Sequence, residues 1–162
     1  MKNILIICFA MLLGQISTAS VSAVSEMQRT SFILSRMTGP GEHTYYNCDY
    51  VESFVRGMLN KLGAEDVRVH CTGGIDNTIR RPMPATVSAR FSSARSTNVN
   101  NSSARAADYK VVTLRASRGC SLANDTYRAI ADKFELETLM GPGFCNSSDA
   151  FHIEARVLKF QQ

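Results

Sequence analysis

Cysteines bracket two segments of this chain, and that arrangement constrains the fold more than any other feature. The first segment, CDYVESFVRGMLNKLGAEDVRVHC, runs from Cys48 to Cys71, and the second runs from Cys120 to Cys145. Within each segment, the spacing of the apolar residues favours a helix followed by an alternating strand. The sequence therefore predicts two helix–strand units, each with a thiol at either end.

In the first unit, the predicted helix and strand have matching lengths. Residues 49–62 carry apolar side chains at the i, i+3, i+4, i+7 spacing of one helical face. Residues 67–71 alternate apolar and polar side chains, as a half-buried strand does. A helix of about 14 residues and a returning strand of about 7 residues cover roughly the same 20 Å. Cys71 is therefore expected to lie beside Cys48.

The second unit repeats this plan. Ser121 is a good N-cap residue, and helical spacing continues to Phe134. Residues 134–138 then alternate apolar and polar side chains. The same length argument brings Cys145 back towards Cys120.

The N-terminus has the pattern of a signal peptide. One lysine precedes an apolar run, residues 4–13, and small residues follow. The run is shorter than the roughly 20 residues that span a bilayer comfortably. We expect residues 1–23 to be removed by cleavage after Ala23, with Ala19 as the second choice, which leaves residues 24–162 as one exported domain. An uncleaved anchor is the alternative.

Removal of this leader takes away Cys8 and leaves four cysteines, an even number that indicates two disulfides in an oxidising compartment. Four cysteines admit three pairings, and we expect Cys48–Cys71 with Cys120–Cys145. The alternative use of four thiols is a zinc site, but the chain has no C-x-x-C pair. We therefore expect no metal and no cofactor, and a periplasmic or secreted location, most simply in a bacterial envelope.

Further alternating segments precede and follow each unit. They are residues 30–34, 85–91, 109–115 and 151–158. Their order predicts an α+β fold with a mainly antiparallel sheet, built from two tandem β-α-β-β halves by internal duplication. The halves span about residues 24–91 and 108–162, and a polar loop, residues 92–107, joins them. A single α+β sheet without duplication is the alternative.

Basic residues are concentrated in the middle of the chain. Between Arg80 and Arg118 there are eight lysine or arginine residues and a single acid, Asp108. The planar fork of arginine binds phosphate or carboxylate through paired hydrogen bonds, so this excess indicates an anionic partner such as a lipid headgroup or a cell-wall polymer. The candidate binding residues are Arg80, Arg81, Arg90 and Arg95. A solvated basic loop is the alternative, and no signature of a nucleic-acid-binding fold is present.

A second candidate surface is the segment that follows the first unit. Its residues 73–84 include Ile75, Ile79 and Met83 together with two prolines. A proline-stiffened loop with exposed apolar side chains loses little entropy on docking, which suits recognition of another protein. The alternative is that these side chains tuck under the sheet.

No catalytic pattern is evident. The three histidines, His43, His70 and His152, occur without a G-x-S-x-G, H-E-x-x-H or P-loop motif. We therefore expect a non-enzymatic module that binds other envelope or secreted proteins, either as an accessory subunit of a cell-envelope or secretion-system assembly or as a secreted inhibitor. The alternatives are a small periplasmic hydrolase of cell-wall material that uses His43 or His152, and an anion-binding domain.

Overall fold

The computed structural model describes residues 20–34, 36–39, 42–75, 83–98, 102–116, 119–141 and 150–161. In chain order the elements are β1 (Val21–Leu34), β2 (Arg36–Gly39), β3 (Glu42–Thr44), α1 (Cys48–Lys61), β4 (Glu65–Gly74), β5 (Met83–Ser96), β6 (Arg105–Ala116), α2 (Cys120–Ile130), the 3-10 turn η1 (Ala131–Lys133), β7 (Leu136–Met140) and β8 (Phe151–Phe160).

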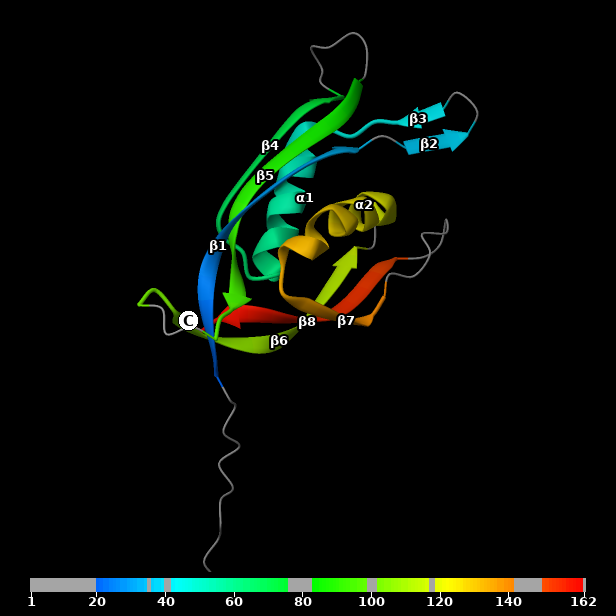
Figure 1. Ribbon diagram of the computed structural model, residues 1–162. Coiled ribbons are helices and arrows are strands. Elements are labelled where there is room, and N and C mark those ends of the chain that lie inside the picture. The colour runs from blue at the N-terminus through cyan, green and yellow to red at the C-terminus, as the bar shows by residue number, and fades with distance from the viewer. Residues whose placement is uncertain are drawn as a thin grey trace, which may run out of the picture.

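Six strands form one antiparallel sheet in the order β4-β5-β1-β6-β8-β7. The sheet is strongly curved, and both helices lie on its inner side (Figure 1). β2 and β3 pair only with each other and form a hairpin that projects beyond the end of β1 (Figure 1). The predicted α+β class with a mainly antiparallel sheet is confirmed.

The sheet consists of two similar sets of three strands that meet edge to edge. β5 lies between β1 and β4 in the first set, and β8 lies between β6 and β7 in the second. The sets meet where β1 pairs with β6, through Val21↔Ala107, Ser22↔Ala106 and Ala23↔Arg105. This order is compatible with two β-α-β-β halves, and internal duplication stays a prediction.

The first predicted disulfide is present. Cys48 begins α1 and is bonded to Cys71 in β4, with their Cα atoms 5.3 Å apart. The two cysteines are therefore joined to each other and are not free thiolate ligands for zinc. Cys120 is also disulfide-bonded. Its predicted partner, Cys145, lies outside the described residues, so the second pairing stays a prediction.

The core fills the space between the helices and the inner face of the sheet. Alternate residues of β5, including Val87 and Phe91, are fully buried there, and the Phe91 ring stacks on Phe134 at 5.3 Å between centroids. Val55 and Leu59 on α1 are also fully buried. Burial of each such side chain stabilises the fold by about 1.5–3 kcal/mol, so the inner face is fixed by packing, whereas side chains of the outer face are exposed.

The predicted joining loop, residues 92–107, is shorter in the structure. β5 continues to Ser96 and β6 begins at Arg105. Ser93 is fully buried, and its hydroxyl donates to the carbonyl of Lys133 at 2.8 Å. Small side chains permit this close approach of β5 to η1, so residues 92–96, predicted as part of a polar loop, are the end of a strand.

The N-terminal region also differs from the prediction. β1 begins at Val21, well before the predicted strand at residues 30–34, and it pairs with β5 without interruption from Ala23 to Leu34. Between β1 and α1 lies the β2–β3 hairpin, in a segment for which no strand was predicted. The second helix begins at Cys120 after Gly119, which adopts a left-handed conformation with a φ of 72°, so Ser121 is not its N-cap.

Polar contacts also join the two halves. Arg105 at the start of β6 makes two hydrogen bonds, of 2.8 and 3.1 Å, to the carboxylate of Glu65 in β4. The Thr30 hydroxyl of β1 donates to the carbonyl of Ala129 in α2 at 3.1 Å. The Ser96 backbone N–H donates to the carboxylate of Glu135 at 2.7 Å. These contacts add to the short β1–β6 pairing and hold the halves in one body.

Candidate anion-binding face

The outer face of β4, β5 and β1 carries three arginines in register. Arg29 of β1 lies directly opposite Arg90 of β5, and Arg90 lies directly opposite Arg68 of β4. Residues that face each other across an antiparallel pair project from the same side of the sheet. All three side chains are exposed. We call Arg29, Arg68 and Arg90 the arginine row.

A bulge in β4 sets the position of Arg68. Glu65 pairs with Ser92 and Arg68 pairs with Arg90, so β4 advances three residues while β5 advances two. Within this bulge Asp66 has a positive φ of 53°. Without the extra residue, Val67 would face Arg90. Bulges commonly redirect a side chain next to a functional site, and this one completes the arginine row.

Polar side chains form the next row of the same face. Ser31 faces Ser88, and Ser88 faces His70. The Ser88 hydroxyl donates to the carbonyl of His70 at 3.4 Å, a long hydrogen bond. The two rows line a surface hollow of about 490 Å³. Beside it, a second hollow of about 400 Å³ is lined by Met27, Asp66, Val67, Arg68 and Arg90.

Ion pairs within the described part of the chain do not neutralise the positive charge of the arginine row. Among the described residues, no carboxylate lies within 4 Å of these three guanidinium groups. By contrast, Arg56, Arg95 and Arg105 each have an acidic partner. In the described part of the chain, the one side-chain hydrogen bond of the row is donated by Arg90 Nε to the sulfur of Met27 at 3.2 Å, a weak acceptor. The row is therefore a concentration of exposed positive charge on the described surface.

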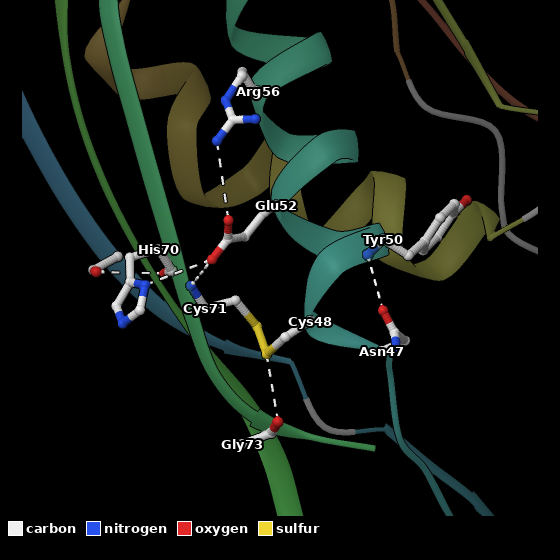
Figure 2. Close-up of a disulfide and its surroundings, with 9 residues drawn as sticks. Asn47, Cys48, Tyr50, Glu52, Arg56, His70, Cys71 and Gly73 are labelled. Carbon is white, nitrogen blue, oxygen red and sulfur yellow. Dashed lines mark hydrogen bonds and ion pairs between the residues drawn. A yellow bond between two sulfur atoms is a disulfide. The ribbon is translucent and has the colours of Figure 1, made fainter. Parts of the chain in front are cut away.

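Glu52 anchors the strand that carries His70 and Arg68. Its Oε1 accepts the backbone N–H of Cys71 at 2.8 Å and lies 3.6 Å from Nδ1 of His70. Figure 2 shows this carboxylate reaching from α1 to β4 next to the Cys48–Cys71 disulfide. The helix start is fixed independently, because the Asn47 side chain accepts the Tyr50 N–H at 3.1 Å. Disulfide and carboxylate together fix this part of β4 against the helix.

The structure distributes the predicted binding residues over several places. Arg90 lies in the arginine row. Arg95 instead pairs with Glu26 at 3.3 Å and donates to the carbonyl of Asp132 at 3.1 Å. Ile75 and Met83 lie where β4 ends and β5 begins, with exposed fractions of 48% and 49%. The remaining predicted residues, Ile79, Arg80 and Arg81, lie outside the described residues.

Two residues of the arginine row were missed by the sequence reasoning. Arg68 lies in a predicted strand, on its polar phase, so its outward direction could have been inferred. Arg29 lies in a part of β1 that was not predicted as a strand. The signal that unites them is the strand register, which depends on the long-range pairing of β1 with β5 and on a bulge.

The histidines give no arrangement typical of a hydrolase. His152 Nε2 lies 3.5 Å from Glu154 Oε1, and both residues lie on the same strand. In the described part of the chain, no hydroxyl or thiol is hydrogen-bonded to the imidazole of His70 or His152. The side chain of His43 lies outside the described side chains.

The wider surroundings complete this description. No three His, Cys, Asp or Glu residues of the described ranges are grouped as a metal site would require. None of the described helices is both long enough and apolar enough to cross a membrane. Comparisons with protein-family models, with curated proteins and with solved structures found no match.

Proposed function

We propose that this protein is an exported, non-enzymatic binding module that docks onto an anionic partner through the outer face of β4, β5 and β1. The observation that carries the proposal is the arginine row, three in-register guanidinium groups that have no acidic partner among the described residues and lie beside a hollow of about 490 Å³. Positive potential in a hollow raises the local concentration of anions and the rate at which they associate.

The energetic cost of the row supports a binding role. Like charges directly opposite each other on neighbouring strands destabilise a sheet by several tenths of a kcal/mol for each pair. Arg90 has such a neighbour on both sides. Sites where a sequence departs from what stability favours are commonly functional sites. An anion bound over the row would remove the repulsion.

The setting of this function is proposed from the sequence and the disulfide. Disulfides persist in oxidising compartments, which agrees with export. In a bacterial envelope, an accessory subunit of an assembly or a secreted inhibitor would need a rigid scaffold with one charged face. Other envelope or secreted proteins and anionic envelope polymers are therefore the proposed partners.

Salt-dependent binding of a polyanion tests the proposal. Fluorescence anisotropy with labelled polyphosphate and labelled polyglutamate chains, measured over a series of sodium chloride concentrations, should show binding to at least one chain that weakens steeply with salt. Arg90→Glu should weaken it at least tenfold. Arg128→Glu makes the same change of charge on the exposed side of α2 and should change the affinity less than twofold. An affinity that does not change with salt, or an equal loss of affinity in Arg90→Glu and Arg128→Glu, would contradict the proposal.

A second candidate function rests on Ile75 and Met83. Both side chains are about half exposed, and Met83 pairs with Gly74, next to Ile75, which places the two residues near each other at the end of the β4–β5 pair. Contiguous exposed apolar surface commonly marks protein contacts. A photo-crosslinking residue at position 75 should capture a protein in the native host, and Met83→Ser should reduce the yield. Crosslinking to no protein would remove this candidate.

A further inference from the structure

The arginine row has the chemistry to select one kind of anion. We infer that it binds a phosphoryl dianion, either inorganic phosphate or a phosphomonoester, with the serines of the next row as additional donors. This inference rests on the proposed function, because it specifies which anion the same face recognises.

The spacing of the row allows all three side chains to converge. Facing residues on antiparallel strands have Cα atoms about 4.5–5.5 Å apart, so Arg29 and Arg68 are roughly 10 Å apart with Arg90 between them. Arginine side chains are long enough for the outer two guanidinium groups to lean over the middle one. The hollow of about 490 Å³ next to the row provides room for a small group held there.

The number of donors fits a phosphoryl group better than a carboxylate. A carboxylate has two oxygens in one plane and a single charge, and one bidentate arginine already occupies both oxygens. A phosphoryl group of a monoester has three strong acceptor oxygens and a charge of about −1.5 to −2 at pH 7. Three guanidinium forks therefore match three oxygens and a double charge.

Two serines next to the arginine row add further hydrogen-bond donors for a phosphoryl group. Ser31 and Ser88 lie one row from Arg29 and Arg90 on the same face. Within the described ranges, the Ser88 hydroxyl makes a single, long hydrogen bond of 3.4 Å to the carbonyl of His70, so it is easily redirected to a ligand. A phosphodiester offers two unbridged oxygens and one charge, and it would leave donors of both rows unused. We therefore expect selection for the monoester over the diester.

Acidic residues near the site do not cancel this selection. Glu52 is bound to the Cys71 N–H and lies beside His70. Glu26 and Glu65 are paired with Arg95 and Arg105. Asp66 lines the adjacent hollow. Glu26, Glu52 and Glu65 are thus engaged by other groups, and among the described residues no carboxylate oxygen, those of Asp66 included, lies within 4 Å of the three guanidinium groups.

Isothermal titration calorimetry at constant ionic strength tests the inference on the purified exported protein. The probes are inorganic phosphate, glycerol 3-phosphate, the diester glycerophosphoglycerol and succinate. Phosphate or glycerol 3-phosphate should bind at least tenfold more tightly than the diester and the dicarboxylate. Equal affinity for the first two would mean that the phosphoryl group alone is recognised, whereas preference for glycerol 3-phosphate would mean that the site takes an organic monoester. Both results support the inference.

Two variants separate fork geometry from charge. Arg90→Lys keeps the charge but replaces the planar fork by a point ammonium, so it should weaken phosphate binding at least tenfold. The matched change Arg128→Lys should leave binding unchanged, and thermal melts should show that both variants fold. Succinate binding as tight as phosphate binding, or full affinity in Arg90→Lys, would overturn the inference while polyanion binding could still uphold the proposed function. Loss of all anion binding, polyanions included, would overturn both.

Discussion

Arg90 lies between Arg29 and Arg68, so its guanidinium has a like charge on each neighbouring strand. The same type of residue elsewhere in the sheet has a different environment. Arg156 of β8 faces Glu137 of β7, and its guanidinium lies 5.1 Å from the centre of the Tyr109 ring. At the scale of single residues, the register therefore decides whether an arginine stabilises or destabilises the sheet.

Replacement of arginine by threonine should change the free energy of unfolding in opposite directions at Arg90 and Arg156. Arg90→Thr removes two repulsive neighbours and introduces a residue that favours strands, so it should raise the free energy of unfolding by about 0.5–1 kcal/mol. Arg156→Thr makes the same exchange but removes the attraction to Glu137 and the contact with the Tyr109 ring, and these losses should outweigh the strand preference of threonine and lower the free energy of unfolding by several tenths of a kcal/mol. Urea denaturation at low salt measures both changes. The stability gained by Arg90→Thr should be smaller in 1 M salt because the charges are screened. Lower stability of Arg90→Thr than of the wild type at low salt would contradict the repulsion.

At the scale of elements, α1 is well defined at both ends but contains a glycine. Gly57 lies on an exposed part of the helix, and a Cβ placed there would meet no atom within 4 Å. Gly63, just beyond the helix, has a φ of +89°, and its Cβ would lie 2.7 Å from Cγ of Lys159. Glycine in a helix interior is less favourable than alanine, whereas a left-handed position requires it.

Alanine at these two glycines should therefore give opposite results. Gly57→Ala should stabilise the protein by about 0.5–1 kcal/mol, because alanine favours the helix and lowers the conformational entropy of the unfolded chain. Gly63→Ala should destabilise it, because the new methyl group meets Lys159 and the backbone conformation is strained. Thermal unfolding followed by circular dichroism compares them. A lower melting temperature for Gly57→Ala than for the wild type would contradict this account of Gly57.

The elements also differ in how far the sequence predicted them. The periodicity of α1 and the matching length of β4 predicted the Cys48–Cys71 bridge, because both are local properties. The end of β5 was not predicted, since Ser92, Ser93 and Ala94 lack alternation and are buried by contacts with distant parts of the chain. The arginine row was not predicted either, because the pairing of three strands and the β4 bulge determine it.

At the scale of the whole molecule, Glu135 joins the two halves. Its carboxylate accepts the Ser96 N–H and the Tyr109 hydroxyl. Burial alone would raise the pKa of Glu135, but these hydrogen bonds and the charge of Arg95 outweigh burial and lower it. A carboxyl with a lowered pKa in the folded state stabilises the fold above its unfolded pKa of about 4.3, and this contribution is lost as the pH falls through the folded pKa.

Glu135→Gln should therefore lower stability in a pH-dependent way. At pH 7 we expect a loss of no more than about 1 kcal/mol, because the group is partly accessible to solvent. The difference in the free energy of unfolding between Glu135→Gln and the wild type should disappear as the pH falls below about 4.3. Urea denaturation at pH 7, 5 and 3 measures this difference in the free energy of unfolding. A difference that persists unchanged at pH 3 would show that the carboxylate charge is not responsible.

The junction of β1 with β6 also bears on processing. Val21, Ser22 and Ala23 make the backbone pairs between these two strands in the described structure. Cleavage of the predicted leader after Ala23 would remove all three, whereas cleavage after Ala19 would retain them. We therefore expect the exported protein to begin at Ser20. Mass spectrometry of the intact exported protein tests this, and a protein that begins at Val24 and is still fully folded would show that the junction is dispensable.

Thermal unfolding of the wild type and Arg90→Thr, with and without inorganic phosphate at equal ionic strength, tests the arginine row most directly. A ligand that binds only the folded state raises its stability. Without phosphate, Arg90→Thr should melt at a higher temperature than the wild type. With phosphate at many times the dissociation constant of the wild type, the wild type should melt at the higher temperature. A wild type that melts higher in both conditions, or one whose melting temperature phosphate does not change, would contradict the account.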